Sequence, residues 1–207
     1  MEIYWSIGVV VMAYLLGSIP SSVWLGRMLK GVDVREYGSG NAGATNTIRV
    51  LGTKIGVVVL LLDMLKGFLA VLLCNFIPVH YSENTFAMLR VIVALFAVIG
   101  HVAPVYVGFK GGKGVATLSG IAVALFPYQV ILIEVLLFIV IFRTTKYVSL
   151  GSIVVSIALP IMIFVFYPSP YPIEFLAVVI AVFIPFTHRK NIIRLINGKE
   201  SKLSLKK

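Results

Sequence analysis

Long apolar stretches alternate with short polar segments along this chain. The apolar stretches cover residues 3–26, 55–78, 86–108, 148–167 and 173–187. A helix of roughly 20 such residues crosses the ~30 Å hydrocarbon core of a membrane. The pattern therefore predicts an all-α integral membrane protein.

A further apolar stretch, residues 115–142, admits two interpretations. As one straight helix it would be about 42 Å long, which is more than the bilayer core needs. Pro127 interrupts it near its middle. It is therefore either one long kinked span or two short spans that form a hairpin around residues 126–128.

Basic residues decide between these interpretations, because lysine and arginine concentrate in cytoplasmic loops. The two-span version places the following cations on the cytoplasmic face: Arg27, Lys30, Arg35, Arg49, Lys54, Lys110, Lys113, Arg143, Lys146, Arg189, Lys190, Arg194, Lys199, Lys202, Lys206 and Lys207. A single kinked span would export the last nine of them. We therefore predict seven transmembrane helices, with the N-terminus outside and the C-terminus in the cytoplasm.

Composition agrees with a polytopic membrane protein. The chain has 207 residues, of which 59% are hydrophobic, and its mean hydropathy is +1.03. Its formal net charge of +10 is explained by the basic loops, so we expect no nucleic-acid partner. We expect residues 1–207 to form a single membrane domain.

The polar segment at residues 35–49 is rich in small residues, hydroxyls and amides. Six of its residues are candidates for binding a phosphorylated substrate: Ser39, Gly40, Asn41, Thr45, Asn46 and Arg49. If a helix begins after Asn41, then Thr45, Asn46 and Arg49 lie on neighbouring turns beside its positive N-terminal end. The alternative is a capped loop, in which Ser39 or Asn41 satisfies N–H groups at the start of the helix.

Residues 108–117 read GFKGGKGVAT and combine four glycines with two lysines. Glycines let backbone N–H groups turn toward an anion, and a helix beginning near Val115 would direct its positive end to the same place. The spacing is one residue short of a nucleotide-binding P-loop, and Lys113 is not followed by serine or threonine. We predict a phosphate-binding loop that includes Gly111, Gly112, Lys113, Gly114 and Thr117. The alternative is a solvated basic turn.

The C-terminal segment carries His188, Asn191 and Arg194, and the first two lie on one face of a helix. They can bind an anion, or the segment can be a basic collar that anchors the last span. His101, just before the glycine-rich loop, is either a proton acceptor or a hydrogen-bonded structural residue. Asp63 and Lys66 are expected to form an ion pair within the second span.

The predicted topology puts the polar segments 35–49, 108–117, 143–149 and 188–200 on one membrane face, where they can form one site. The sequence lacks a G-x-S-x-G nucleophile motif, carboxylate pairs and cysteine clusters. We therefore expect neither a metal nor a cofactor, and a reaction that depends on binding and stabilising anions.

Three ordered motifs resemble those of one known family. GSGN at 38–41 with GATN at 43–46, GH at 100–101 with KGGKG at 110–114, and HR at 188–189 followed by Asn191, Ile192 and Arg194 are similar to the bacterial membrane acyl-phosphate:glycerol-3-phosphate acyltransferases, known as PlsY. The resemblance covers nearly the whole chain and includes residues 147–150, with Ser149.

The resemblance implies an enzyme of phospholipid synthesis in the bacterial cytoplasmic membrane. It would transfer a fatty acyl group from acyl phosphate to the 1-hydroxyl of sn-glycerol 3-phosphate, and a soluble enzyme would supply the acyl phosphate. We expect Lys113 and Ser39 in catalysis, with His101 and His188 as alternative bases to a substrate phosphate. The other candidates, Ser149 among them, would bind phosphate. A transporter of phosphorylated metabolites is the main alternative, although the chain lacks the internal repeat typical of transporters.

Overall fold

The computed structural model describes residues 2–78 and 81–204, and every regular element in these ranges is a helix or a 3-10 turn. Lys206 and Lys207 of the predicted basic tail lie outside the described residues. The described chain divides into two compact units, residues 2–124 and 125–204. The prediction of a single domain stays a prediction.

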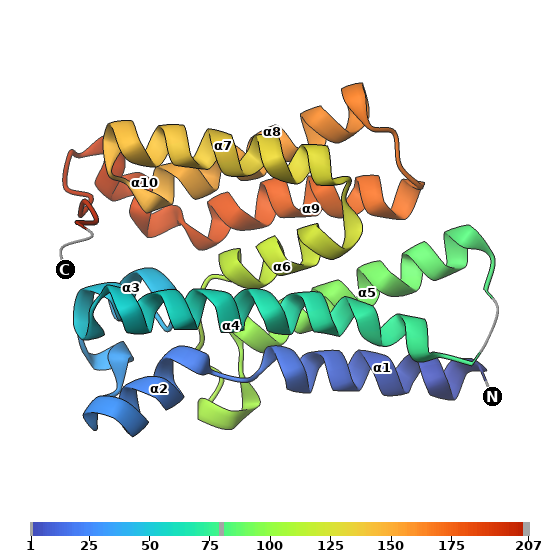
Figure 1. The fold of residues 1–207 in the computed structure, drawn as a ribbon, viewed down its shortest axis with the longest axis horizontal. Coiled ribbons are helices and arrows are strands. Elements are labelled where there is room, and N and C mark those ends of the chain that lie inside the picture. The colour runs from blue at the N-terminus through green and yellow to red at the C-terminus, as the bar shows by residue number, and fades with distance from the viewer. Residues whose placement is uncertain (1, 79–80, 205–207) are drawn as a thin grey trace. The chain divides into compact units, whose positions relative to one another are not determined.

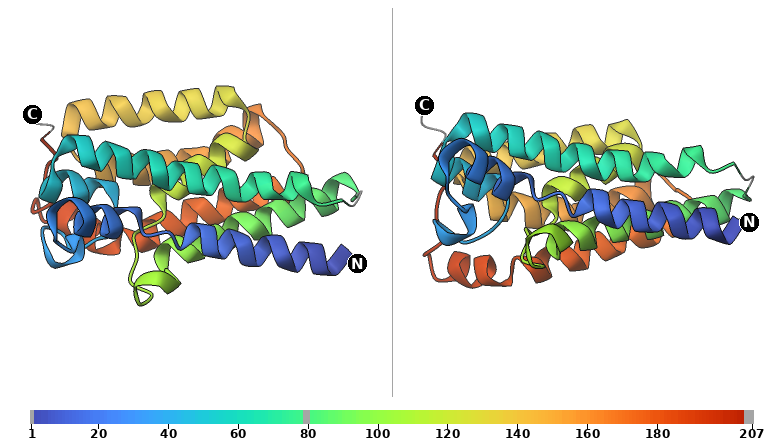
Figure 2. Two further views of the ribbon diagram at one scale, coloured as in Figure 1. Left: turned by 60° about the horizontal axis from the view of Figure 1, so that its bottom comes forward. Right: turned by 90° about the horizontal axis from the view of Figure 1, so that it is seen from below.

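The first unit is built on three long helices, α1 (Glu2–Gly17), α4 (Thr53–Leu72) and α5 (Glu83–Val102), which lie side by side (Figures 1 and 2). Glycines allow this close packing, since a Cβ on Gly17 would overlap the backbone of Ala97 on α5. Shorter elements complete the unit: α2 (Ser21–Lys30), α3 (Ala44–Leu51), α6 (Val115–Leu125), and the 3-10 turns Val34–Glu36, Leu73–Phe76 and Val105–Val107.

The predicted first span is not one continuous helix. It is broken between Gly17 and Ser21, because Pro20 has no N–H group to continue the hydrogen-bond ladder. The break leaves the carbonyl of Ile19 and the side chain of Ser21 close to α4, where both have partners. The segment Ile3–Lys30 is nevertheless long and apolar enough to cross a membrane.

Helices α6 and α4 cross with their backbones in close contact. A Cβ on Gly67 would overlap the carbonyl of Thr117, and a Cβ on Gly120 would overlap the carbonyl of Met64. Paired small residues of this kind are typical of helix contacts in membranes. The contact fixes the N-terminal part of α6, and with it the end of the glycine-rich loop, on α4.

The second unit contains α7 (Tyr128–Thr145), α8 (Val148–Phe166), α9 (Tyr171–Thr187) and the short α10 (Arg189–Ile196). Helix α8 contacts both α7 and α9. Helices α9 and α10 meet at 62°, directly after Thr187.

The structure supports part of the predicted topology. Five described helical segments are long and apolar enough to span a membrane, and the number is six if the bent pair of α9 and α10 counts as one span. The helix predicted to break around residues 126–128 is broken there, since α6 ends at Leu125 and α7 begins at Tyr128. At 11 residues, α6 is only about 16 Å long. Seven spans and their orientation therefore remain a prediction.

We expect Gly120→Ala to destabilise the first unit. The new methyl group would meet the rigid backbone of Met64 and separate α4 from α6. Overpacking of this kind typically costs ~1–3 kcal/mol, so the melting temperature in detergent should fall by several degrees. Gly8→Ala is the matched control, because its methyl group meets nothing within 4 Å. Equal melting temperatures for the two variants would contradict the close crossing.

Candidate active site

The glycine-rich loop is held by its own backbone. The N–H of Gly111 donates to the carbonyl of Val102 (3.0 Å), and the N–H of Gly112 donates to that of His101 (3.2 Å). A Cβ on Gly111 would overlap the His101 carbonyl, and one on Gly112 would overlap the His101 ring at Nε2. Glycine is therefore required at both positions because His101 leaves no room for a side chain.

These bonds correct one expectation about the loop. The N–H groups of Gly111 and Gly112 do not turn toward an anion, because they are engaged with α5 carbonyls. Helix α6 begins at Val115 as predicted, after Gly114 in a left-handed conformation (φ 84°). Because the first N–H groups of an α-helix have no intrahelical acceptor, an anion can be held at this end, next to the partly exposed Lys113.

Asn46 organises the first polar segment from within. Its side chain is 1% exposed, accepts from the N–H of Ser39 (2.8 Å), and donates to the carbonyls of Val34 (2.7 Å) and Tyr37 (3.1 Å). This leaves Ser39 and Gly40 exposed on the loop surface. Asn46 thus shapes the loop, and its predicted contact with substrate remains a prediction.

Helix α3 begins at Ala44, so the predicted helix after Asn41 is confirmed. Its N-cap is Gly43, which has no side chain, so neither Ser39 nor Asn41 caps it at that position. Thr45 is half-buried and Arg49 is exposed. Both lie on this helix as expected.

Arg35 joins the first polar segment to the glycine-rich loop, a role that its sequence neighbours do not indicate. Its guanidinium donates to the carbonyls of Val107 (2.8 Å) and Lys110 (3.1 Å), while Asp33 accepts from it at 2.7 Å. The hydrogen bond from Arg35 holds the pKa of Asp33 well below its usual range. The sequence around Arg35 could not indicate its partners, because the carbonyls that it binds lie 72 and 75 residues away in the chain.

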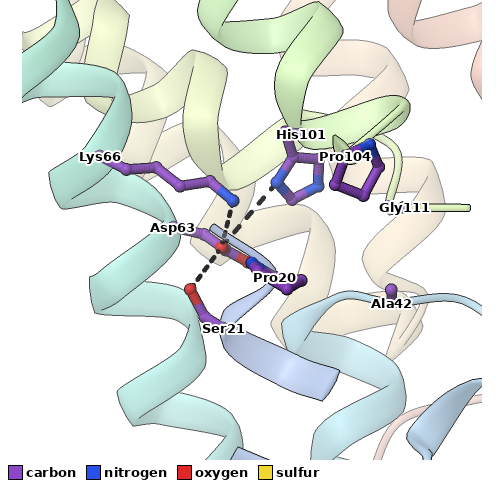
Figure 3. A pocket seen from close by; sticks show the side chains of 9 residues that line it. Pro20, Ser21, Ala42, Asp63, Lys66, His101, Pro104 and Gly111 are labelled. Carbon is purple, nitrogen blue, oxygen red and sulfur yellow. Dashed lines mark hydrogen bonds and ion pairs between the residues drawn. The ribbon is translucent and has the colours of Figure 1, made fainter. Parts of the chain in front are cut away.

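Behind the loop lies a small buried pocket with a charged floor (Figure 3). Its lining residues come from the α1–α2 break, α4, α5 and the two loops: Pro20, Ser21, Ala42, Asp63, Lys66, His101, Pro104, Gly111 and Gly112. The predicted ion pair is confirmed, since Lys66 Nζ is 2.9 Å from Asp63 Oδ1. Asp63 also accepts from Ser21 (3.0 Å), and Lys66 donates to the carbonyl of Ile19 (2.8 Å).

His101 completes this pocket. Its Nδ1 is 3.1 Å from the hydroxyl of the fully buried Thr117 and 3.8 Å from Asp63 Oδ1. Its Nε2 edge faces Gly112. Thr117 therefore has an internal partner, and its predicted contact with phosphate remains a prediction.

The C-terminal candidates meet around a carboxylate of the chain itself. Glu200 accepts from Ser149 Oγ (2.7 Å) and Asn191 Nδ2 (2.6 Å) at one oxygen, and from Arg194 Nε (2.7 Å) at the other. Asn191 and Arg194 thus bind Glu200 in this structure, whereas His188 Nδ1 is bonded to the carbonyl of Ile184. The binding of a phosphate by His188 and Asn191 stays a prediction. The exposed Arg189, Lys190 and Lys199 fit the basic collar.

Two further details define this C-terminal group. The side chain of Glu200 is 5% exposed, and burial alone would raise the pKa of its carboxyl. The three hydrogen bonds outweigh that cost and lower the pKa below its ordinary value of 4.5. The buried His188 donates from Nδ1 to the carbonyl of Ile184 (2.8 Å), so a neutral ring accepts a proton at Nε2.

The structure thus assembles the predicted residues in two groups. The first unit holds the motifs at 38–49 and 100–117, and the second unit holds Ser149, His188, Asn191 and Arg194. One site that includes both groups stays a prediction. Within the described ranges, no group of three or more His, Cys, Asp and Glu side chains is placed to hold a metal ion.

Comparison with known proteins decides the family. The model of the family described as glycerol-3-phosphate acyltransferase matches residues 7–198. The chain belongs to this family. The resemblance read from its three motifs is confirmed, and the protein is an acyltransferase.

This acyltransferase is 45% identical to the glycerol-3-phosphate acyltransferase of Fusobacterium nucleatum over 93% of its own length and 95% of that protein's. Its structure also matches crystal structures of PlsY, an integral membrane glycerol 3-phosphate acyltransferase. The glycerol 3-phosphate form aligns with a TM-score of 0.86 at 41% identity and covers 96% of each chain. The lysophosphatidic acid form aligns with a TM-score of 0.83 at 40% identity, over 97% of this chain and 96% of the other.

We expect Glu200→Gln to lower stability at neutral pH. The neutral amide removes the charge that the three donors bind, and it places an NH₂ group where a carboxylate oxygen accepted. We expect this to cost ~1–3 kcal/mol of the free energy of unfolding. Because folding lowers the pKa of Glu200, its stabilisation is present above about pH 4.5 and is lost as the pH falls through the folded value.

Melting temperatures of both proteins from neutral to acidic pH check this expectation. The variant should start lower and lose less on acidification, so that the two curves converge. Curves that stay parallel throughout would contradict a structural role of the charged Glu200.

Proposed function

We propose that this acyltransferase transfers a fatty acyl group from acyl phosphate to the 1-hydroxyl of sn-glycerol 3-phosphate, with lysophosphatidic acid and inorganic phosphate as products. The observation that carries the proposal is the end of the glycine-rich loop, where Lys113 adjoins the start of α6 at the end of an apolar helix bundle. A lysine and a helix N-terminus suit a phosphate group, and the neighbouring apolar helices suit its acyl chain.

The reaction needs no nucleophile from the protein, since acyl phosphate is already activated. The hydroxyl oxygen of glycerol 3-phosphate bonds to the acyl carbon, and the bond from that carbon to the phosphate oxygen breaks. Phosphate leaves with the electron pair, and Lys113 with the start of α6 stabilises its charge. One preorganised donor of this kind is typically worth ~3 kcal/mol of barrier.

The hydroxyl proton has three candidate acceptors. We favour a phosphate oxygen of the substrates, because carboxylates near the glycine-rich loop are committed to ion pairs. His188 has Nδ1 on a carbonyl, so Nε2 is the ring atom through which it would act. His101 is buried, with Nδ1 beside Thr117 and its Nε2 edge facing Gly112.

Glycerol 3-phosphate would be held by the exposed loop residues Ser39 and Gly40, with Asn41, Thr45 and Arg49. Ser149, His188, Asn191 and Arg194 of the second unit remain candidates for binding phosphate. We place the site at the cytoplasmic side of a bacterial membrane, with the C-terminus on that side, where a soluble enzyme can supply acyl phosphate. The basic loops and the apolar helices support this orientation.

We expect Lys113→Ala to lower kcat/KM with acyl phosphate by about 100-fold or more, because the leaving phosphate loses its cation. The assay follows lysophosphatidic acid from labelled glycerol 3-phosphate in purified, reconstituted protein. Lys110→Ala is the matched control, since it removes the same charge from the same loop and Lys110 is exposed.

An equal loss of kcat/KM in both lysine variants would favour the alternative in which residues 108–117 form a solvated basic turn. No acyl transfer by the unaltered protein, together with uptake of glycerol 3-phosphate into proteoliposomes, would favour the transporter.

We expect His101→Gln and His188→Gln to leave measurable turnover, because the substrate phosphate takes the proton. The pH dependence of kcat in each variant is the measurement. A loss of more than about 1000-fold in one variant, with the loss of one ionisation from its pH profile, would identify that histidine as the base instead.

A further inference from the structure

The buried Asp63–Lys66 pair joins four separate parts of the chain. Lys66 reaches the carbonyl of Ile19 at the break between α1 and α2, and Asp63 accepts from Ser21 just after it. Asp63 also faces His101, at the last turn of α5. Through the bond between His101 and Thr117, the network extends to α6.

Stability alone does not explain this pair. Asp63 and Lys66 are 2% and 4% exposed, and removing two charges from water costs several kcal/mol, which their attraction repays only in part. Well-packed apolar residues in place of such a pair are often neutral or stabilising. The partners of the pair, rather than its strength, indicate what it does.

The contacts lead from the pair to the glycine-rich loop. His101 meets Gly112 at two points. Its carbonyl accepts from the Gly112 N–H, and its ring occupies the space that a Cβ on Gly112 would need. The Asp63 carboxylate and the Thr117 hydroxyl both face Nδ1 of that ring. A rotation or shift of His101 would therefore displace Gly111 and Gly112, which lead directly into Lys113.

We propose that Asp63 and Lys66 are positioning residues that act through His101 to set the backbone of the glycine-rich loop, and so the position of Lys113. They do not touch the substrate. This inference rests on the proposed function in one respect, because the phosphate that the loop holds belongs to acyl phosphate. Its structural core, the dependence of the loop on the pair, does not require that function.

The test replaces both charges at once, since removing one would leave the other buried and unpaired. Asp63→Asn with Lys66→Met keeps an acceptor for Ser21 and an unbranched side chain of similar length. Arg90→Met is the matched control. It removes another cation from the same bundle. Arg90 lies about 16 Å from His101 along α5 and donates to the carbonyl of Ala124.

The first readout is hydrogen exchange at the Gly111 and Gly112 amides in the full-length protein. We expect exchange to accelerate by about tenfold or more in the double variant, because the loop opens more often, and to stay unchanged in Arg90→Met. The second readout is kinetic. We expect the KM for acyl phosphate to rise by about tenfold, at a melting temperature within a few degrees of the original.

Each outcome decides the inference. Unchanged exchange in a folded double variant overturns it, whatever the kinetics show. Accelerated exchange supports it, even if the unaltered protein fails to use acyl phosphate, in which case the proposed function alone falls. If the double variant does not fold, Ser21→Ala keeps both charges and removes one donor to Asp63; faster exchange at the loop supports the inference, and none overturns it.

Discussion

Charges buried in an apolar helix bundle must find every partner within the protein, and this requirement shapes the first unit around Asp63 and Lys66. The regular part of a helix has no backbone group to offer, because its carbonyls and N–H groups bind one another. Lys66 therefore takes the carbonyl of Ile19, which the break before Pro20 makes available. The break in the first apolar segment and the ion pair in the second are parts of one arrangement.

Close backbone contact is the second condition for this arrangement. Gly67 and Gly120 bring α4 and α6 together without side chains between them, and Gly111 and Gly112 bring the loop against His101. Glycines in this chain thus serve two purposes. Those at 108 and 114 adopt left-handed conformations (φ 72° and 84°), whereas those at 111 and 112 are required for space.

The sequence predicted the helical membrane fold, the start of α6, the break before Tyr128 and the Asp63–Lys66 pair, because each follows from local periodicity, proline or spacing. It did not predict the break at residues 18–20, since the apolar run continues through it. Arg35 and Ser21 were also missed. Their partners lie far along the chain, and only the packing of helices brings them near. Side-chain chemistry alone cannot distinguish a residue that binds substrate from one that holds a loop, as Asn46 shows.

The same ambiguity explains Glu200. A hydroxyl, an amide and a guanidinium that converge on two oxygens describe a site for a carboxylate as well as for a phosphate. In this chain the carboxylate is supplied from within, six residues after Arg194, and it orders the segment that follows α10. Lys113 differs from that group because it lies just before the N-terminus of α6, at the end of a loop that is held in place. The loop is held by hydrogen bonds from Gly111, Gly112 and Arg35. Rigid support behind a partly exposed cation is what electrostatic stabilisation of a leaving phosphate requires, because donors that are already oriented need no reorganisation as the charge develops.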